Sequence, residues 1–368
     1  MNGAALLFPN LGAEEGEGWR RTARHPRVRD AARLWCALFP EDARVVGAAV
    51  PLDRELAAPF ARDAGRPALA FCKPGRALVP WLASEEAAAL ARGEGVPLAG
   101  PGPAVVGSVH DKAFALEQAR AHRLLPPEIA DTAFALAPDE LAEADTARCR
   151  IERAVARWPA PLRERFALKP RLGTSGRGRL LGRAGRLDPA ALAGALARLR
   201  GRGGCVVEPW LARSADFSAQ LFVEGPGHVR VLGSFAQLLT PAGLPLGHRG
   251  RIGAGGGPES GSPWDAELRA GALELAGAAA AAGFRGACGV DAFAFAGADG
   301  RPRLRAVVEL NARFTAGTTA AGWLARALRA ELLQPGAEFY LGVAPAPLAA
   351  ERIELLAAPC ESALFAAR

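Results

Sequence analysis

The stretch Val307-Val308-Glu309-Leu310-Asn311-Ala312-Arg313, with Asp291 before it, decides the fold. Its alternation predicts a β-strand, on which side chains two residues apart share a face. Glu309 and Asn311 therefore present a carboxylate and an amide carbonyl to one point, and Arg313 has the same parity. A hairpin turning at 297–302 would place Asp291 beside them, which gives three oxygen ligands of the kind Mg²⁺ prefers. A surface strand with alternating polar residues is the competing interpretation.

A second motif places a lysine before a glycine-rich loop. The sequence reads Lys169-Pro170-Arg171-Leu172-Gly173-Thr174-Ser175-Gly176-Arg177-Gly178. Backbone N–H groups of such a loop can close over phosphates. It differs from a P-loop, because the lysine precedes the glycines and no GKS or GKT leads into a helix. An ordinary turn remains the alternative.

Two shorter motifs are weaker. Asp111-Lys112 lies where a capping box from Ser108 predicts a helix start, and a helix N-terminus with an ammonium favours an anion. The segment Val206-Val207-Glu208-Pro209-Trp210-Leu211 could present its backbone to an adenine edge, or be an apolar core strand. The composition supports a chemical role for Lys112, Lys169 and Asn311, because these residue types are rare in the chain. The arginine-rich chain keeps only three lysines (Lys73, Lys112, Lys169) and three asparagines (Asn2, Asn10, Asn311).

The 368 residues suit two or three packed subdomains. Strands expected at 4–8, 43–50 and 68–72 alternate with helices at 28–38 and 85–91, which predicts a mainly parallel α/β unit. A Gly/Pro-rich link at 93–103 follows, then a helix that starts at the capping box of 108–111 and runs to about 123, and a helix at 139–158. Strands are expected at 166–169, 180–181, 205–211, 216–223 and 229–239. A further helix begins at Ser262-Pro263 and ends at Gly283, and another covers 320–330.

Composition excludes several classes of protein. No apolar run reaches the roughly 20 residues of a membrane helix. The apolar run at 4–8 is shorter than the core of a signal peptide and follows no basic segment, so we expect it to be a first strand. The six cysteines lie far apart, which predicts reduced thiols in a cytoplasmic protein. The net charge is +7, but the arginines are scattered, so no nucleic-acid partner is expected.

Taken in order along the chain, these motifs resemble the ATP-grasp superfamily over roughly residues 105 to 325. The resemblance implies an α/β (α+β) ATP-grasp fold behind a Rossmann-like pre-ATP-grasp domain. It implies an N-terminal α/β domain at 1–105, a central subdomain with a glycine-rich lid at 106–205, and a C-terminal subdomain with the metal site at 206–368.

The resemblance also implies roles for single residues. Lys112 and Lys169 would hold the α- and β-phosphates, and Arg313 would stabilise the transferring phosphoryl group. Asp291, Glu309 and Asn311 would bind one or two Mg²⁺ ions, with Mn²⁺ as an alternative metal. The remaining nucleotide contacts would come from the loop, the adenine-binding segment and a ribose carboxylate: Gly173, Thr174, Ser175, Gly176, Gly178, Glu208, Pro209, Trp210, Leu211 and Asp216.

The chain departs from D-alanine:D-alanine ligases at Gly289, where they carry an arginine. We expect Arg251 or Arg285 to supply that charge. His248 is a candidate base for the amine, or simply an exposed loop residue. Asn10 and Glu14, after the first strand, are candidate substrate contacts, with an ordinary turn as the alternative.

The expected activity is an ATP-dependent carboxylate–amine ligase that forms an amide through an acyl phosphate and releases ADP and phosphate. Its partners would be a small carboxylate and a small amine, such as amino acids or a peptide. A phosphotransferase on the same scaffold and a non-catalytic nucleotide-binding regulator are the alternatives. The sequence leaves the oligomeric state open, and a dimer is expected if the chain associates.

Overall fold

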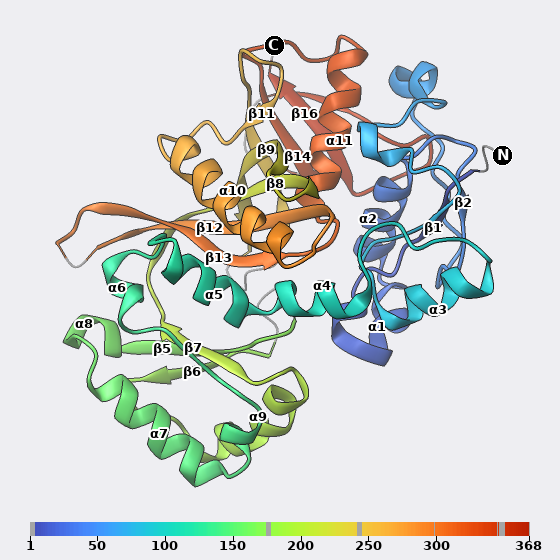
Figure 1. The fold of residues 1–368 in the computed structure, drawn as a ribbon. Coiled ribbons are helices and arrows are strands. Elements are labelled where there is room, and N and C mark those ends of the chain that lie inside the picture. Colours follow the sequence, from blue (N-terminus) through green and yellow to red (C-terminus); the bar gives the residue numbers. More distant parts are fainter. Residues whose placement is uncertain are drawn as a thin grey trace.

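The structure is a computed structural model that describes residues 4–173, 178–240, 245–297, 299–343, 345 and 350–367. Within these residues the chain forms three β-sheets from successive stretches of sequence. Figure 1 shows the N-terminal part in blue on one side, the large C-terminal sheet, yellow to red, beside it, and the central part in green below. The α/β architecture expected from the sequence is confirmed.

The N-terminal sheet has three parallel strands in the order β2-β1-β3. The strand expected at 68–72 is wrong. That stretch forms a 3₁₀ turn, because Pro67 and Pro74, which cannot donate to a strand ladder, bracket it closely. The elements of this part are β1 (Leu6–Phe8), η1 (Ala13–Gly18), α1 (Trp19–Thr22), α2 (Pro26–Cys36), β2 (Arg44–Val45), η2 (Ala58–Asp63), η3 (Ala70–Cys72), β3 (Leu78–Pro80) and α3 (Glu85–Gly93).

Two consecutive helices, α4 (Pro103–His110) and α5 (Lys112–Ala121), lead into the central part. The capping box expected from Ser108 is wrong, because Ser108 lies inside α4. Asp111 is the N-cap of α5, and its carboxylate accepts a hydrogen bond from the Ala113 N–H at 2.8 Å. A carboxylate at the cap fixes the first turn, which carries Lys112, and α5 packs against β13 (Pro302–Asn311).

The central sheet has four antiparallel strands in the order β4-β7-β5-β6. Its core joins Phe166 and Leu168 of β5 with Ile151 of α7 and Leu199 of α9, all fully buried. The chain leaves this sheet after Pro209, at the end of β7, and its next strand belongs to the large sheet. The elements are α6 (Pro127–Ala130), β4 (Phe134–Leu136), η4 (Asp139–Leu141), α7 (Ala144–Ala156), α8 (Ala160–Arg163), β5 (Arg165–Pro170), β6 (Leu180–Arg183), α9 (Pro189–Gly201) and β7 (Cys205–Pro209).

The large sheet is antiparallel, in the order β13-β12-β8-β9-β10-β14-β16-β15, with β11 paired to β10. Helix α10 packs against β8, β9, β12 and β13. Proline was expected at the first helical position, but α10 begins at Asp265, after Pro263. Gly283, in the left-handed region, follows its end. The remaining elements are β8 (Arg213–Gly225), β9 (His228–Leu239), β10 (Pro245–Ile252), β11 (Pro258–Glu259), α10 (Asp265–Ala281), β12 (Gly286–Ala296), α11 (Ala316–Arg329), β14 (Glu338–Val343), β15 (Glu351–Ile353) and β16 (Ser362–Ala367).

None of the helices in the described part of the chain is long and apolar enough to cross a membrane.

Candidate active site

The hairpin of β12 and β13 brings the three predicted oxygen-bearing side chains together. Asp291 lies directly opposite Glu309 in the strand register, and Gly289 lies opposite Asn311. The Asn311 Nδ2 donates to Asp291 Oδ2 at 3.1 Å. A residue that the sequence did not single out, Gln237 of β9, donates from Nε2 to Asp291 Oδ1 at 2.9 Å. The carboxylate of Asp291 is therefore held from two sides.

Two neighbouring carboxylates in a partly buried place repel each other. Burial first, and then the charge of Glu309, raise the pKa of Asp291 above its usual range. Burial also acts to raise the pKa of Glu309, but the ammonium of Lys112 outweighs it and brings that pKa below its usual range. A carboxylate pair suits a divalent cation, which would relieve the repulsion. The amide of Asn311 turns its nitrogen toward Asp291, and its oxygen accepts a hydrogen bond from Arg313. The described residues contain no group of three or more His, Cys, Asp and Glu side chains that could hold a metal ion. At this place the carboxylates are two, and the third side chain is the amide of Asn311.

Both lysines that the sequence predicted line the cavity that holds this carboxylate pair, and Lys112 contacts it directly. Lys112 Nζ lies 2.9 Å from Glu309 Oε2 and donates to the carbonyl oxygen of Gly173 at 2.9 Å. Lys169 forms a buried ion pair with Glu208. Burial lowers the pKa of Lys169 to about 8, although the charge of Glu208 acts to raise it. The third lysine of the chain, Lys73, is exposed.

The side chain of Glu208 is engaged inside the protein. Its Oε2 lies 2.8 Å from Nη2 of Arg305, and the Lys169 pair occupies its other oxygen. Arg305 is only 2% exposed and also donates from Nε to the carbonyl of Val307 at 3.1 Å. The sequence did not reveal this arginine. Its partner is about a hundred residues away, so no local pattern points to it. For an adenine contact, this segment therefore offers the backbone from Pro209 onward.

Aromatic and basic side chains form one end of the site. The ring of Trp210 has Arg179 at 4.8 Å and Arg213 at 5.7 Å from its centroid. Arg213 also donates to Asp216 Oδ1 at 2.7 Å, so the predicted ribose carboxylate already has a cationic partner. Gly173 and Gly178 flank the glycine loop at this end, both with positive φ. Thr174, Ser175 and Gly176 lie outside the described residues.

Asp291, Glu309 and Asn311 are called the metal corner below, and Arg313 lies on the side of it away from Trp210. Its Nη2 donates to Asn311 Oδ1 at 3.1 Å, its Nη1 donates to the carbonyl of Phe314 at 2.9 Å, and its guanidinium lies over the Trp81 ring. It also forms an ion pair with Glu14, from the 3₁₀ helix η1 that follows β1. The side chain of Glu14 is 4% exposed, and its second oxygen has no hydrogen-bond partner in the described residues. The N-terminal part of the chain therefore contributes directly to this site.

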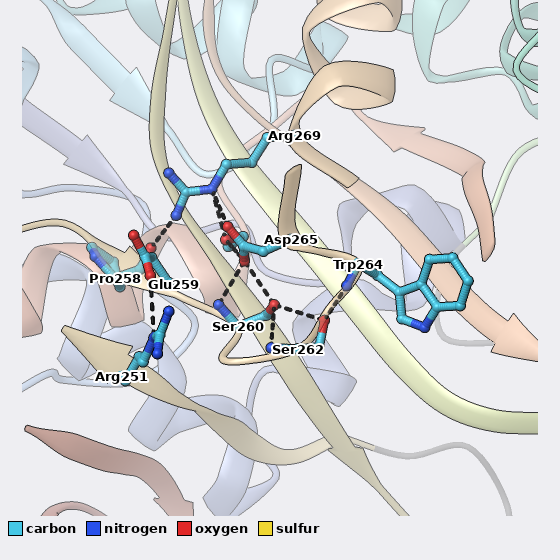
Figure 2. Close-up of polar contacts among 9 residues, drawn as sticks. Arg251, Pro258, Glu259, Ser260, Ser262, Trp264, Asp265 and Arg269 are labelled. Carbon is cyan, nitrogen blue, oxygen red and sulfur yellow. Dashed lines mark hydrogen bonds and ion pairs between the residues drawn. The ribbon is translucent and has the colours of Figure 1, made fainter. Parts of the chain in front are cut away.

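Several predicted side chains do not reach the cavity. Arg251 pairs with Glu259 at 3.2 Å in a cluster beside α10 (Figure 2) and is 60% exposed. Arg285 donates to the carbonyls of Ala280 and Phe284 at the end of α10. Asn10 is fully buried and holds the backbone of Leu82 through both its donor and its acceptor, so it has the structural role that a turn residue would have.

Gly289, the position where D-alanine:D-alanine ligases carry an arginine, is closely covered by the side chains of Gln220 and Thr315. A β-carbon built at Gly289 would lie 2.9 Å from Gln220 Oε1 and 3.0 Å from Thr315 Cγ2. Gln220 itself accepts hydrogen bonds from the hydroxyls of Thr315 at 2.5 Å and Thr318 at 3.1 Å. A neutral network at the start of α11 therefore fills the space.

One cavity of about 1120 Å³ joins these groups. It is lined by Trp210 and Asp216 at one end, by both lysines and the metal corner, and by Glu14, Arg313 and the start of α11 beyond them. Its far end lies between α2 and strands β14 and β16, where the sequence indicated no chemistry. The volume exceeds the usual range for a single small ligand, so there is room for more than one.

His248 also lines this cavity, on β10. It is 6% exposed, and its ring meets Phe235 edge-on. Burial lowers its pKa to about 4. His248 is therefore neutral at pH 7 and too weak a base to take a proton from an amine readily.

No protein-family model matches the sequence, and no curated protein is significantly similar to it. Solved structures do match the fold. The biotin carboxylase domain of Hydrogenobacter thermophilus 2-oxoglutarate carboxylase, solved with MgADP, ADP and bicarbonate, superposes over 100% of this chain and 85% of its own. The TM-score is 0.54 and the identity 15%.

Two other solved structures also match the fold of this chain. Carboxyaminoimidazole ribonucleotide synthase from Aspergillus clavatus, complexed with ATP, matches 99% of this chain and 93% of its own, with a TM-score of 0.50 and 16% identity. D-alanyl-alanine synthetase A from Vibrio cholerae matches 86% of this chain and 90% of its own, with a TM-score of 0.50 and 13% identity. These structures are ATP-grasp proteins, and this chain therefore has the ATP-grasp fold.

Proposed function

We propose that this protein is an ATP-dependent ligase that joins a small carboxylate to a small amine and releases ADP and phosphate. The observation that carries the proposal is the meeting of Asp291, Glu309 and Asn311 with Lys112 and Lys169 in one cavity. Two carboxylates and two ammonium groups within one buried site suit a metal–triphosphate. The solved ATP-grasp structures, with MgADP or ATP bound, support the same choice of ligand.

Each residue has a proposed task. Lys112 and Lys169 bind the α- and β-phosphates, and the loop from Gly173 to Gly178 covers the phosphates. The backbone at Pro209, Trp210 and Leu211 holds the adenine, and Asp216 orients the ribose. Arg313 stabilises the charge on the transferring phosphoryl group. Its four contacts hold the guanidinium in place before the reaction.

Magnesium, or manganese in its place, would be held by Asp291, Glu309 and Asn311 as one or two ions, and would neutralise charge on the phosphates. The substrate carboxylate oxygen attacks the γ-phosphorus and ADP leaves. The amine nitrogen then attacks the acyl carbon, phosphate leaves, and the amine loses a proton. The side chains position the reactants and exclude water, and none of them acts as a nucleophile. The unpaired oxygen of Glu14 is a proposed substrate contact.

The uncharged side chains around Gly289 bear on how the substrate is recognised. Because Gln220 and Thr315 fill that space without charge, the acceptor would not be recognised by an arginine there. The partners would be small molecules such as amino acids or a peptide, in a cytoplasmic enzyme that would be a dimer if it associates.

The test is an ADP-release screen across paired carboxylate and amine libraries, with Glu309→Ala as the blank. We expect ADP and free phosphate only with a matched pair, and a hydroxamate when hydroxylamine replaces the amine. Release of AMP would contradict the acyl-phosphate route. A phosphorylated hydroxyl product would instead indicate a phosphotransferase, and nucleotide binding without turnover would indicate a regulator.

A further inference from the structure

Three polar side chains of strand β8 line one wall of the cavity, called its floor here, and Ser218 differs from the other two in its hydrogen bonding. On strand β8, Asp216, Ser218 and Gln220 alternate with apolar residues and so share one face. Asp216 is bonded to Arg213, and Gln220 to Thr315 and Thr318. The hydroxyl of Ser218 lines the cavity and has no hydrogen-bond partner in the described part of the chain, although Ser218 is only 1% exposed.

A buried hydroxyl without a partner is a cost to the fold. Unsatisfied buried polar groups are uncommon in native proteins, and each one loses the hydrogen bonds that it would make with water. Such a group in the wall of a cavity is accounted for when a ligand supplies the missing partner. Ser218 therefore indicates a ligand atom, and its position indicates which one.

Ser218 lies directly opposite Asp291 in the register of β8 and β12, and Asp291 lies opposite Glu309. Side chains of directly opposed residues have β-carbons roughly 5 Å apart. An oxygen bound close to the Asp291 carboxylate is therefore within reach of the Ser218 hydroxyl. The lysines proposed for the phosphates come from α5 and β5, outside this sheet. Ser218 lies instead on the floor, between the metal corner and the neutral network of Gln220.

We propose that Ser218 is a further substrate-binding residue, whose hydroxyl donates a hydrogen bond to an oxygen of the substrate carboxylate beside Asp291. The inference rests on the proposed ligase function. An uncharged donor suits this task, because it orients the carboxylate without quenching the nucleophilicity of its oxygen as a cation would. The ligand class at this point is thus an anionic carboxylate oxygen, and the phosphates of the nucleotide lie elsewhere.

The fold offers a matched control in Ser234. Ser234 is also fully buried and sits on the neighbouring strand β9, but next to Ala219 in the register, so it faces the opposite side of the sheet. Its hydroxyl donates to Asp265 Oδ1 at 2.6 Å and accepts from Arg269 Nε at 3.0 Å. Figure 2 shows Asp265 and Arg269 in the cluster that ties Ser260 and Ser262 to the start of α10. Ser234 is therefore a satisfied serine outside the cavity.

The experiment compares Ser218→Ala, Ser218→Thr and Ser234→Ala with the wild-type protein. It uses the carboxylate that gives the highest ADP release in the screen. Ser218→Ala should raise the KM for that carboxylate about tenfold or more, which corresponds to one lost hydrogen bond, and leave the KM for ATP within twofold. Its midpoint of thermal unfolding should be unchanged or higher. Ser218→Thr, which keeps the hydroxyl, should stay near the wild-type KM. Ser234→Ala should unfold at a lower temperature with both KM values unchanged.

Two results would overturn the inference while the ligase function stands. One is an unchanged carboxylate KM in Ser218→Ala. The other is an equal rise in the KM for ATP, which would place the hydroxyl on a phosphate instead. If the wild-type protein released ADP with no carboxylate at all, the proposed function would fail and this inference with it.

Discussion

At the scale of single residues, the site concentrates groups that a fold alone would avoid. Asp291 and Glu309 lie side by side in a partly buried place, Ser218 has no partner in the described chain, and the same holds for one oxygen of Glu14. The neutral histidine His248 stands among them. Each of these features costs folding free energy, so their gathering around one cavity points to ligand binding.

His248 gives a prediction about acid stability. Its pKa in the folded protein is about 4, below the roughly 6.5 of an unfolded chain. Above pH 6.5 both states are neutral and no free energy is lost. As the pH falls from 6.5 toward 4, the unfolded state takes up a proton that the folded state does not, and up to about 3 kcal/mol of stability is lost. Urea unfolding across this pH range should show that His248→Leu reduces the loss.

The control is His228→Leu, because His228 is exposed at the start of the neighbouring strand β9. This variant should keep the wild-type pH dependence. An identical slope in His248→Leu and the wild-type protein would mean that His248 is not buried as the structure has it.

At the scale of elements, helix α4 and strand β13 are joined by one hydrogen bond. The last residue of α4, His110, accepts at Nδ1 from the backbone N–H of Ala312 at 3.1 Å, and both residues are buried. Ala312 lies between Asn311 and Arg313. Helix α4, which ends at His110, therefore fixes the end of β13. The next helix, α5, begins with Lys112.

Removal of this bond should affect both stability and metal use. His110→Leu leaves the Ala312 N–H buried without a partner, which should cost about 1–3 kcal/mol. It should also raise the Mg²⁺ concentration for half-maximal ADP release, because Asn311 and Arg313 lose their support. His110→Asn keeps an acceptor near the Nδ1 position and should recover most of both properties. Urea unfolding and a Mg²⁺ titration would measure them.

His122→Leu provides the comparison for this pair, since His122 is partly exposed and pairs with Glu274 away from the cavity. It should change neither quantity. Equal metal dependence in His110→Leu and the wild-type protein would show that β13 holds its own end without the histidine.

At the scale of the whole molecule, the N-terminal part is tied to the C-terminal part by a buried ion cluster. Asp63 of η2 bonds Arg326 of α11 at 2.5 Å, and Arg329 one turn later. Arg326 is fully buried and also bonds the carbonyls of Ala37 and Arg66. The cluster fixes η2 of the N-terminal part against α11, the helix that begins three residues after Arg313.

Breaking this cluster should strongly destabilise the protein. Asp63→Asn would leave two arginines near each other without their counter-charge, and loss of one partner of a buried pair typically costs about 3–5 kcal/mol. Asp299→Asn removes an exposed pair with Arg303, which water and salt screen, and should cost far less stability. Urea unfolding of both variants would test this contrast. Equal costs would argue that the Asp63 cluster is solvated.

The sequence by itself determined the hairpin that carries Asp291, Glu309 and Asn311, and the order of the other motifs along the chain. Side-chain alternation and the turn at 297–302 are local properties, so they placed Glu309 and Asn311 on one face and predicted the strand that carries Asp291. The same local rules placed Lys169 ahead of the glycine loop. They failed at residues 68–72 and at the start of α5, where proline spacing and the Asp111 cap prevailed.

Only the tertiary structure decided which distant side chains meet. Arg305 on Glu208, His110 on Ala312 and Gln237 on Asp291 join positions that are tens to hundreds of residues apart. The same packing placed Arg251 and Arg285 outside the cavity and closed the space at Gly289 with Gln220. These contacts follow from the order of the strands in the large sheet and from its packing against the helices and the central sheet, and no periodicity within a single segment contains that information.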